Sequence, residues 1–156
     1  SWTFLRYNKR ARKIMITNAL VGAVSTLVLF FLQAKLPLAG LDSALLGPAL
    51  FMMGLGAAAG AKISQYFSGS SYVRMLLASG VGVLFAFGMT FTGRHYLMIL
   101  GGFVGALSDD FLEVRTDVLL NEMIPSGQRA TLISVSSFLF SVVMIVMSTL
   151  MGWIMG

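Results

Sequence analysis

Five long apolar stretches, separated by short polar turns, dominate the chain. A bilayer core requires roughly 20 mostly apolar residues in each helix that crosses it. We therefore expect transmembrane helices over about residues 14–32, 43–63, 73–91, 96–120 and 130–153. The intervening segments contain Gly, Pro and Ser, which are typical of turns. The pattern predicts an all-α integral membrane protein in which residues 14–156 form a transmembrane helical bundle.

Composition supports this interpretation. Hydrophobic residues make up 57% of the 156 residues and charged residues only 11%, with a mean hydropathy of +0.86. An average soluble domain is about 45–50% apolar and about 25% charged. So few charges do not suffice to cover a water-soluble globule, which excludes an ordinary cytosolic enzyme and a disordered tail. The absence of Cys excludes a disulfide scaffold.

Cations mark one side of the predicted bundle. A cluster immediately precedes the first apolar stretch and consists of Arg6, Lys9, Arg10, Arg12 and Lys13. Cations beside a hydrophobic span indicate the cytoplasmic side, so we interpret residues 1–13 as a cytoplasmic basic linker that contacts the bilayer surface. The net charge of +5 does not indicate nucleic-acid binding, because no stripe of interleaved basic and aromatic residues accompanies it.

Helix alternation extends this assignment to the other loops. With the amino end in the cytoplasm, Lys62, Arg74 and Arg129 fall on the same side, and only Lys35 and Arg94 fall opposite. We expect a multi-pass protein of the plasma membrane or the bacterial inner membrane. The chain starts with Ser rather than Met, and its last apolar stretch stops abruptly, so we expect a fragment of a longer protein.

The fourth predicted span carries most of the acids. Four of the six acidic residues lie within nine positions: Asp109, Asp110, Glu113 and Asp117. The spacing of four places Asp109, Glu113 and Asp117 on one helical face. An ionised side chain near the membrane midplane costs about 2.5–3.5 kcal/mol on insertion scales. We therefore expect the acids to line a hydrated path and to bind a proton, a cation or a cationic substrate.

An alternative remains open for the two acids nearer the predicted inner face. Glu113 and Asp117 are equally compatible with simple ion pairs at a wide inner mouth, with Arg115 and Arg129 as partners. In the functional interpretation, the same two arginines support the site as an ion pair or a gate.

Polar side chains on other spans are weaker candidates. Ser134, Ser137 and Ser141 share one face of the fifth span, and Asn18 lies in the first. They either face a polar cavity or serve helix packing. Gly56 and Gly60 have the small-xxx-small spacing of closely packed membrane helices.

The segment 121–140 reads NEMIPSGQRATLISVSSFLF, with Ile124-Pro125, Arg129-Ala130-Thr131 and Ser134 at its core. It resembles the loop between the tenth and eleventh helices of major facilitator superfamily transporters. The resemblance implies that the five spans are helices seven to eleven of a six-helix bundle. It further implies that an amino-terminal half and a twelfth helix complete the transporter. In that family the seventh and tenth helices face the central cavity, and the eighth and eleventh pack against the other half.

We thus expect a secondary active transporter that moves a small solute by alternating access, coupled to protons as a symporter or an antiporter. It needs no catalytic residue, no cofactor and no metal. An alternative is a Mg²⁺-dependent enzyme, because 109–113 has the form DDxxE, similar to the aspartate-rich motif of membrane prenyltransferases. Such enzymes carry a second acidic motif on another helix, which the other spans lack. A non-transporting membrane scaffold is the third possibility.

Overall fold

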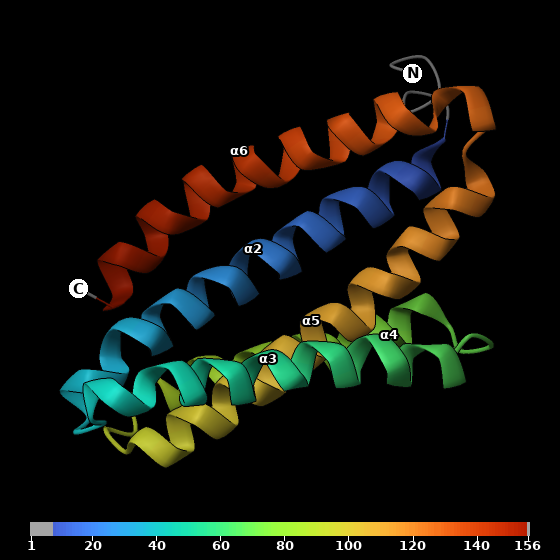
Figure 1. Ribbon diagram of the computed structural model, residues 1–156. Helices are drawn as coiled ribbons and strands as arrows, with labels where there is room; N and C mark the ends of the chain where they lie inside the picture. The colour runs from blue at the N-terminus through green and yellow to red at the C-terminus, as the bar shows by residue number, and fades with distance from the viewer. Residues whose placement is uncertain (1–7, 156) are drawn as a thin grey trace.

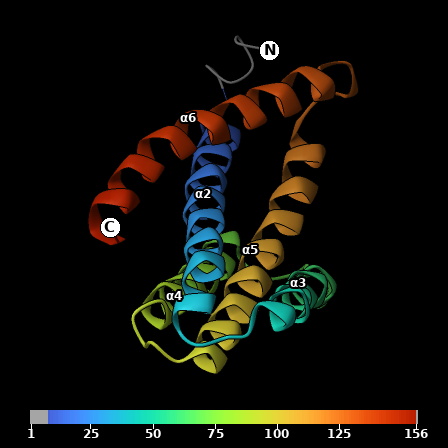
Figure 2. The same ribbon diagram turned by 60° about the vertical axis from the view of Figure 1, so that its left-hand side comes forward.

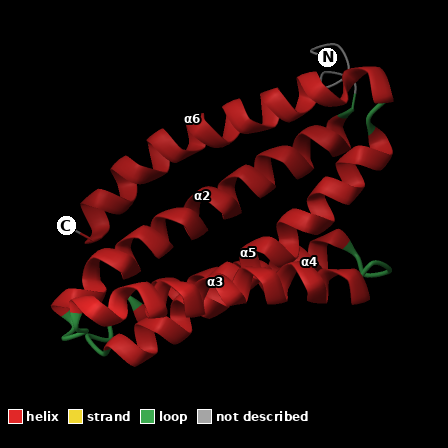
Figure 3. Cartoon of the chain, viewed as in Figure 1, coloured by secondary structure: helices red, strands yellow, loops and turns green. Residues whose placement is uncertain are grey.

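A computed structural model describes residues 8–155, and this part of the chain is all-helical, without a strand (Figure 3). The elements are α2 (Lys9–Leu38), α3 (Ser43–Tyr66), α4 (Tyr72–Met89), α5 (His95–Met123), the short 3₁₀ turn η1 (Ser126–Gln128) and α6 (Arg129–Met155). Each of the five predicted spans overlaps one of the long helices. The all-α class is therefore confirmed.

Four helical stretches are long and apolar enough to cross a membrane. They are α2, α3, α4 and Ser126–Ile154, which contains most of α6. The acids of α5 lower its hydropathy, and it does not belong to this group. The prediction of membrane-crossing helices is thus supported for four segments by length and composition.

The first helix is longer than predicted at both ends. The Asn8 side chain accepts a hydrogen bond from the Ala11 amide at 3.1 Å and caps the helix at Lys9. Lys9, Arg10, Arg12 and Lys13, which we assigned to a linker, therefore lie in the first turns of α2, and Arg6 lies outside the described residues. At the other end, the helix continues past residue 32 and through Pro37 to Leu38. Its last turn is closed by hydrogen bonds from the Ala39 amide to the carbonyl groups of Lys35 and Leu36.

Helix α5 lies between α3 and α4 (Figure 2), and α6 runs along α2 (Figure 1). A Cβ atom on Gly56 or Gly60 of α3 would collide with the backbone of Phe103 or Leu107 of α5. The predicted small-xxx-small pair is therefore the contact through which these two helices approach. On the α4 side, a Cβ atom on Gly82 would collide with the side chain of Ser108. These contacts occupy two faces of α5 and leave its acidic face directed toward α2 and α6.

Helix α6 packs along α2 and is the least buried of the four apolar stretches (Figure 2). Only 6% of its most apolar 18-residue segment is buried, whereas 22–39% of the corresponding segments of the other three helices is buried. Leu132 and Met151 are buried against neighbouring helices, whereas Phe138 and Ile145 are about 70% exposed (71% and 69%). The outer face of α6 is thus apolar and open to lipid or to further helices.

The basic residues are unevenly divided between the two ends of the bundle. At one end, His95 Nδ1 lies 3.3 Å from the Ala39 carbonyl oxygen, and Lys35 Nζ lies 5.3 Å from the centre of the Phe91 ring. At the other end, the amino-terminal turns of α2 and α4 meet the carboxyl-terminal half of α5, bringing Arg10, Lys13 and Arg115 together. The basic cluster of the sequence thus lies at the end away from Lys35.

Candidate functional site

The acids of α5 face the space that α2 and α6 border. Asp109, Glu113 and Asp117 follow one another at intervals of one helical turn. A Cβ atom on Gly22 of α2 would lie 3.7 Å from Asp109 Oδ1 and 3.5 Å from Phe140 Cε2 of α6. The Asp109 carboxylate therefore stands where the three helices meet, at a point where α2 has no side chain.

One turn toward the basic end, this region opens into a cavity of about 290 Å³. Small-molecule sites occupy about 300–1,000 Å³, so this volume suits a small solute. Its polar lining comes from three helices: Asn18 of α2, then Glu113, Asp117 and Asn121 of α5, and Arg129, Ser136 and Ser137 of α6. Its apolar lining is Met15, Leu120, Ile124, Leu132 and Ile133.

The two acids in the cavity and the third one above it differ in exposure. Glu113 and Asp117 are exposed, whereas Asp109 is partly buried. Ser25 lies one turn beyond Gly22 on α2 and is 1% exposed. Its buried hydroxyl lies within reach of the Asp109 carboxylate. Ser25 and Asp109 therefore form a polar contact between α2 and α5 beyond the cavity.

The two arginines that we predicted to support the site lie apart. Arg129 lines the acidic cavity, and its Nη2 donates a hydrogen bond to the Asn121 carbonyl oxygen at 3.1 Å. This bond ties the start of α6 to the end of α5. Arg115 instead lines a separate basic cavity with Arg10 and Lys13. Asp110, the remaining acid of the predicted set, is partly buried and is not among the residues that line the acidic cavity.

The predicted hydroxyl face of α6 is divided. Ser137 lines the cavity. The hydroxyl groups of Ser134 and Ser141 donate to carbonyl oxygens of their own helix, those of Ala130 at 3.2 Å and Ser137 at 3.0 Å. Such bonds satisfy a hydroxyl within the helix.

Two cavity residues were missed by the sequence analysis, although their signal was present. Asn121 follows Asp117 by four residues and continues the acidic row by one turn. Ser136 follows Arg129 by seven residues, or two helical turns, and thus shares its face. Both lie at helical spacing from residues that we had singled out.

Within the described part of the chain, no group of three or more His, Cys, Asp or Glu side chains is placed to hold a metal ion. Comparisons with protein families, with curated proteins and with solved structures found no match. The case for a function therefore rests on the geometry of the acidic cavity.

Proposed function

We propose that this chain is part of a secondary active transporter of the major facilitator type, which moves a small solute by alternating access and couples it to protons. One observation carries the proposal. Two carboxylates of a helical row, those of Glu113 and Asp117, line a cavity between three helices of an otherwise apolar bundle, and the third, that of Asp109, stands one turn beyond it. Ionisable groups inside a membrane bundle are costly, and they mark the path of a substrate or an ion.

The proposal makes α5 the fifth membrane-crossing helix. Its 29 residues correspond to a length of about 44 Å at 1.5 Å per residue, well above the roughly 30 Å of a bilayer core. Helices α3 and α4 cover two of its faces, and Asp109, Glu113 and Asp117 lie on a third face. In a membrane, this arrangement directs the row toward the cavity that α2 and α6 border.

The same arrangement provides a coupling mechanism. In alternating access, one bundle rocks against the other around a site near the midplane. A protonated carboxyl group is neutral and tolerates an apolar environment, whereas its ionised form requires water or a cation. Proton binding to the acidic row therefore changes the relative free energies of states that differ in hydration of the cavity. Solute movement is then linked to the proton gradient.

The charge of the cavity indicates the class of solute. Two negative charges, those of Glu113 and Asp117, line the cavity with one positive charge, that of Arg129. The Arg129 guanidinium also donates a hydrogen bond to the Asn121 carbonyl oxygen. The remaining lining is amide, hydroxyl and apolar. This combination fits a small amphipathic cation better than an anion, because the cation replaces the proton as partner of the carboxylates.

The test uses the full-length protein reconstituted into vesicles that contain a pH-sensitive dye, with tetraphenylphosphonium and ethidium as probe cations. We expect cation addition to drive proton movement, and we expect the double variant Glu113→Gln/Asp117→Asn to abolish it. Glu122→Gln is the matched control, because Glu122 is an exposed acid of α5 that does not line the cavity. Cation-dependent proton movement that is unchanged in the double variant contradicts the proposal, as does its absence from the unsubstituted protein.

A further inference from the structure

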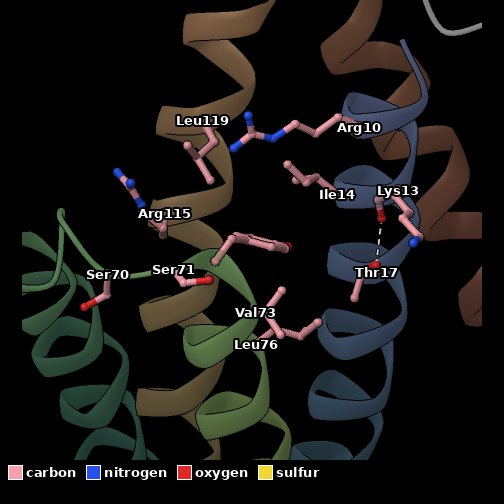
Figure 4. A pocket seen from close by; sticks show the side chains of 11 residues that line it. Arg10, Lys13, Ile14, Thr17, Ser70, Ser71, Val73, Leu76, Arg115 and Leu119 are labelled. Atoms are coloured by element: carbon pink, nitrogen blue, oxygen red, sulfur yellow. Dashed lines mark hydrogen bonds between the residues drawn. The ribbon is translucent and has the colours of Figure 1, made fainter.

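A second cavity, of about 450 Å³, lies between the amino-terminal turns of α2 and α4 and the carboxyl-terminal half of α5 (Figure 4). Three cationic side chains line it: Arg10 and Lys13 from α2, and Arg115 from α5. Figure 4 shows Arg10 reaching from α2 toward α5. No carboxylate is among the lining residues. Glu113 and Asp117 line the other cavity, and no acid of α5 lines this one.

Neutral hydrogen-bond donors add to the cations. The hydroxyl-bearing residues Thr17, Ser70, Ser71 and Tyr72 all contribute to the lining. Ser71 is the N-cap of α4, yet its side chain makes no capping hydrogen bond. The first amides of a helix have no partner within the helix, and the positive end of the helix dipole lies there. The amino terminus of the 18-residue helix α4 therefore offers donors to the cavity that its own cap leaves free.

One of the three cationic side chains has a hydrogen-bond donor without a partner. Arg115 Nε is buried and has no hydrogen-bond partner among the described residues. A guanidinium has five N–H donors in a planar fork that matches the geometry of a phosphate or a carboxylate. A buried donor without a partner indicates that a group absent from the chain satisfies it. An anion in the cavity supplies that group.

The apolar part of the lining points to the source of the anion. Ile14, Val73, Leu76 and Leu119 share the cavity with the cations, and Val73 is exposed on the outer face of α4. An amphiphile that places its charged head in this cavity, at Arg10, can therefore lay its hydrocarbon chain along α4. Basic pockets between transmembrane helices on the cytoplasmic side are typical sites for anionic lipid head groups.

We propose that this cavity binds a phosphate group, that of an anionic phospholipid at the cytoplasmic leaflet. The phosphate accepts hydrogen bonds from the Arg10 guanidinium and from the first turn of α4, and Lys13 and Arg115 contribute charge from either side of the cavity. The site is distinct from the acidic cavity. It requires only that the bundle lies in a membrane, so it does not depend on transport.

The experiment measures thermal unfolding of the full-length protein in detergent during titration with three probes. These are dioleoyl phosphatidylglycerol, zwitterionic dioleoyl phosphatidylcholine and inorganic phosphate. We expect phosphatidylglycerol to raise the unfolding temperature at lower concentration than phosphatidylcholine. We expect Arg10→Gln and Lys13→Gln each to weaken this binding about five-fold, the factor that corresponds to ~1 kcal/mol per cation near an anionic surface.

Arg12→Gln is the matched control, because Arg12 is an exposed cation next to Lys13 that does not line the cavity. If inorganic phosphate alone stabilises the protein and Arg10→Gln removes that stabilisation, the cavity is a phosphate site whose ligand is a soluble anion rather than a lipid. The proposal is overturned if phosphatidylglycerol and phosphatidylcholine act equally and phosphate has no effect. It is also overturned if Arg12→Gln weakens binding as much as Lys13→Gln, because the effect is then that of general surface charge.

Discussion

Replacing Gly56 by Ala tests the close approach of α3 to α5, on which the placement of the acidic row depends. A Cβ atom at this position would lie 2.9 Å from the carbonyl carbon of Phe103 and 3.1 Å from its Cα. Ordinary van der Waals contact between carbon atoms requires about 3.5–4.0 Å. The carbonyl oxygen of Phe103 lies closer still. The obstacle is backbone rather than a flexible side chain, so the two helices have to move apart.

The expected cost follows from this geometry. Inserting a single methyl group into a well-packed interface typically costs 1–3 kcal/mol, and Gly60 one turn away meets the backbone of Leu107 in the same manner. Separation at Gly56 therefore weakens the neighbouring contact as well. We expect Gly56→Ala to lower the free energy of unfolding by about 2 kcal/mol, measured by denaturant titration of the full-length protein in detergent micelles.

Gly54→Ala provides the control on the same helix. Nothing lies within 4 Å of a Cβ atom at Gly54, and Ala is favoured over Gly in a helix by up to about 1 kcal/mol. The two substitutions, identical in chemistry and two residues apart, should therefore have opposite signs. Equal effects, or a stabilised Gly56→Ala variant, would refute the packing of α3 on α5.

Two further predictions concern the hydrogen bond between α4 and α5 and the hydration of the acidic cavity. The hydrogen bond of 3.1 Å between the Tyr72 hydroxyl and Thr116 Oγ1 joins α4 to α5. Tyr72→Phe should therefore lower the free energy of unfolding by about 0.5–1.5 kcal/mol, and a double-mutant cycle with Thr116→Val should show that the two effects are not additive. The chain has no Cys, so a thiol introduced at Ser137 in the acidic cavity should react with a membrane-impermeant maleimide, because the reactive thiolate needs water. A thiol at Ile145, on the outer apolar face of α6, should not react; equal labelling at both positions would contradict a hydrated cavity.

Local features of the chain were predictable because they depend on neighbours in sequence. The apolar stretches fix the helices, and Asp42 fixes the start of α3 by accepting a hydrogen bond from the Ala44 amide at 2.8 Å. The common face of Asp109, Glu113 and Asp117 follows from the helical repeat alone. The end of α2 was misjudged because Pro37 was interpreted as a loop residue. In the last turn of a helix, a proline removes few hydrogen bonds.

Long-range features were not predictable in the same way. The sequence places Arg115 among the acids of α5, two residues from each of Glu113 and Asp117, and the first expectation was a supporting ion pair or a gate. In the structure it lines a separate cavity with Arg10 and Lys13, which are about a hundred residues away in the chain. Which face of α5 meets which helix depends on the fit of Gly56, Gly60 and similar glycines against it. Periodicity along a single helix does not contain that information.

The central claim is that the acidic row couples proton binding to solute movement. The most direct measurement compares two activities of the full-length Asp109→Asn variant in vesicles: accumulation of a probe cation driven by a pH gradient, and exchange of the same cation at equal pH. Asn keeps the shape of the side chain and removes its proton, so we predict that accumulation is lost while exchange continues. Accumulation that matches the unsubstituted protein would contradict the account.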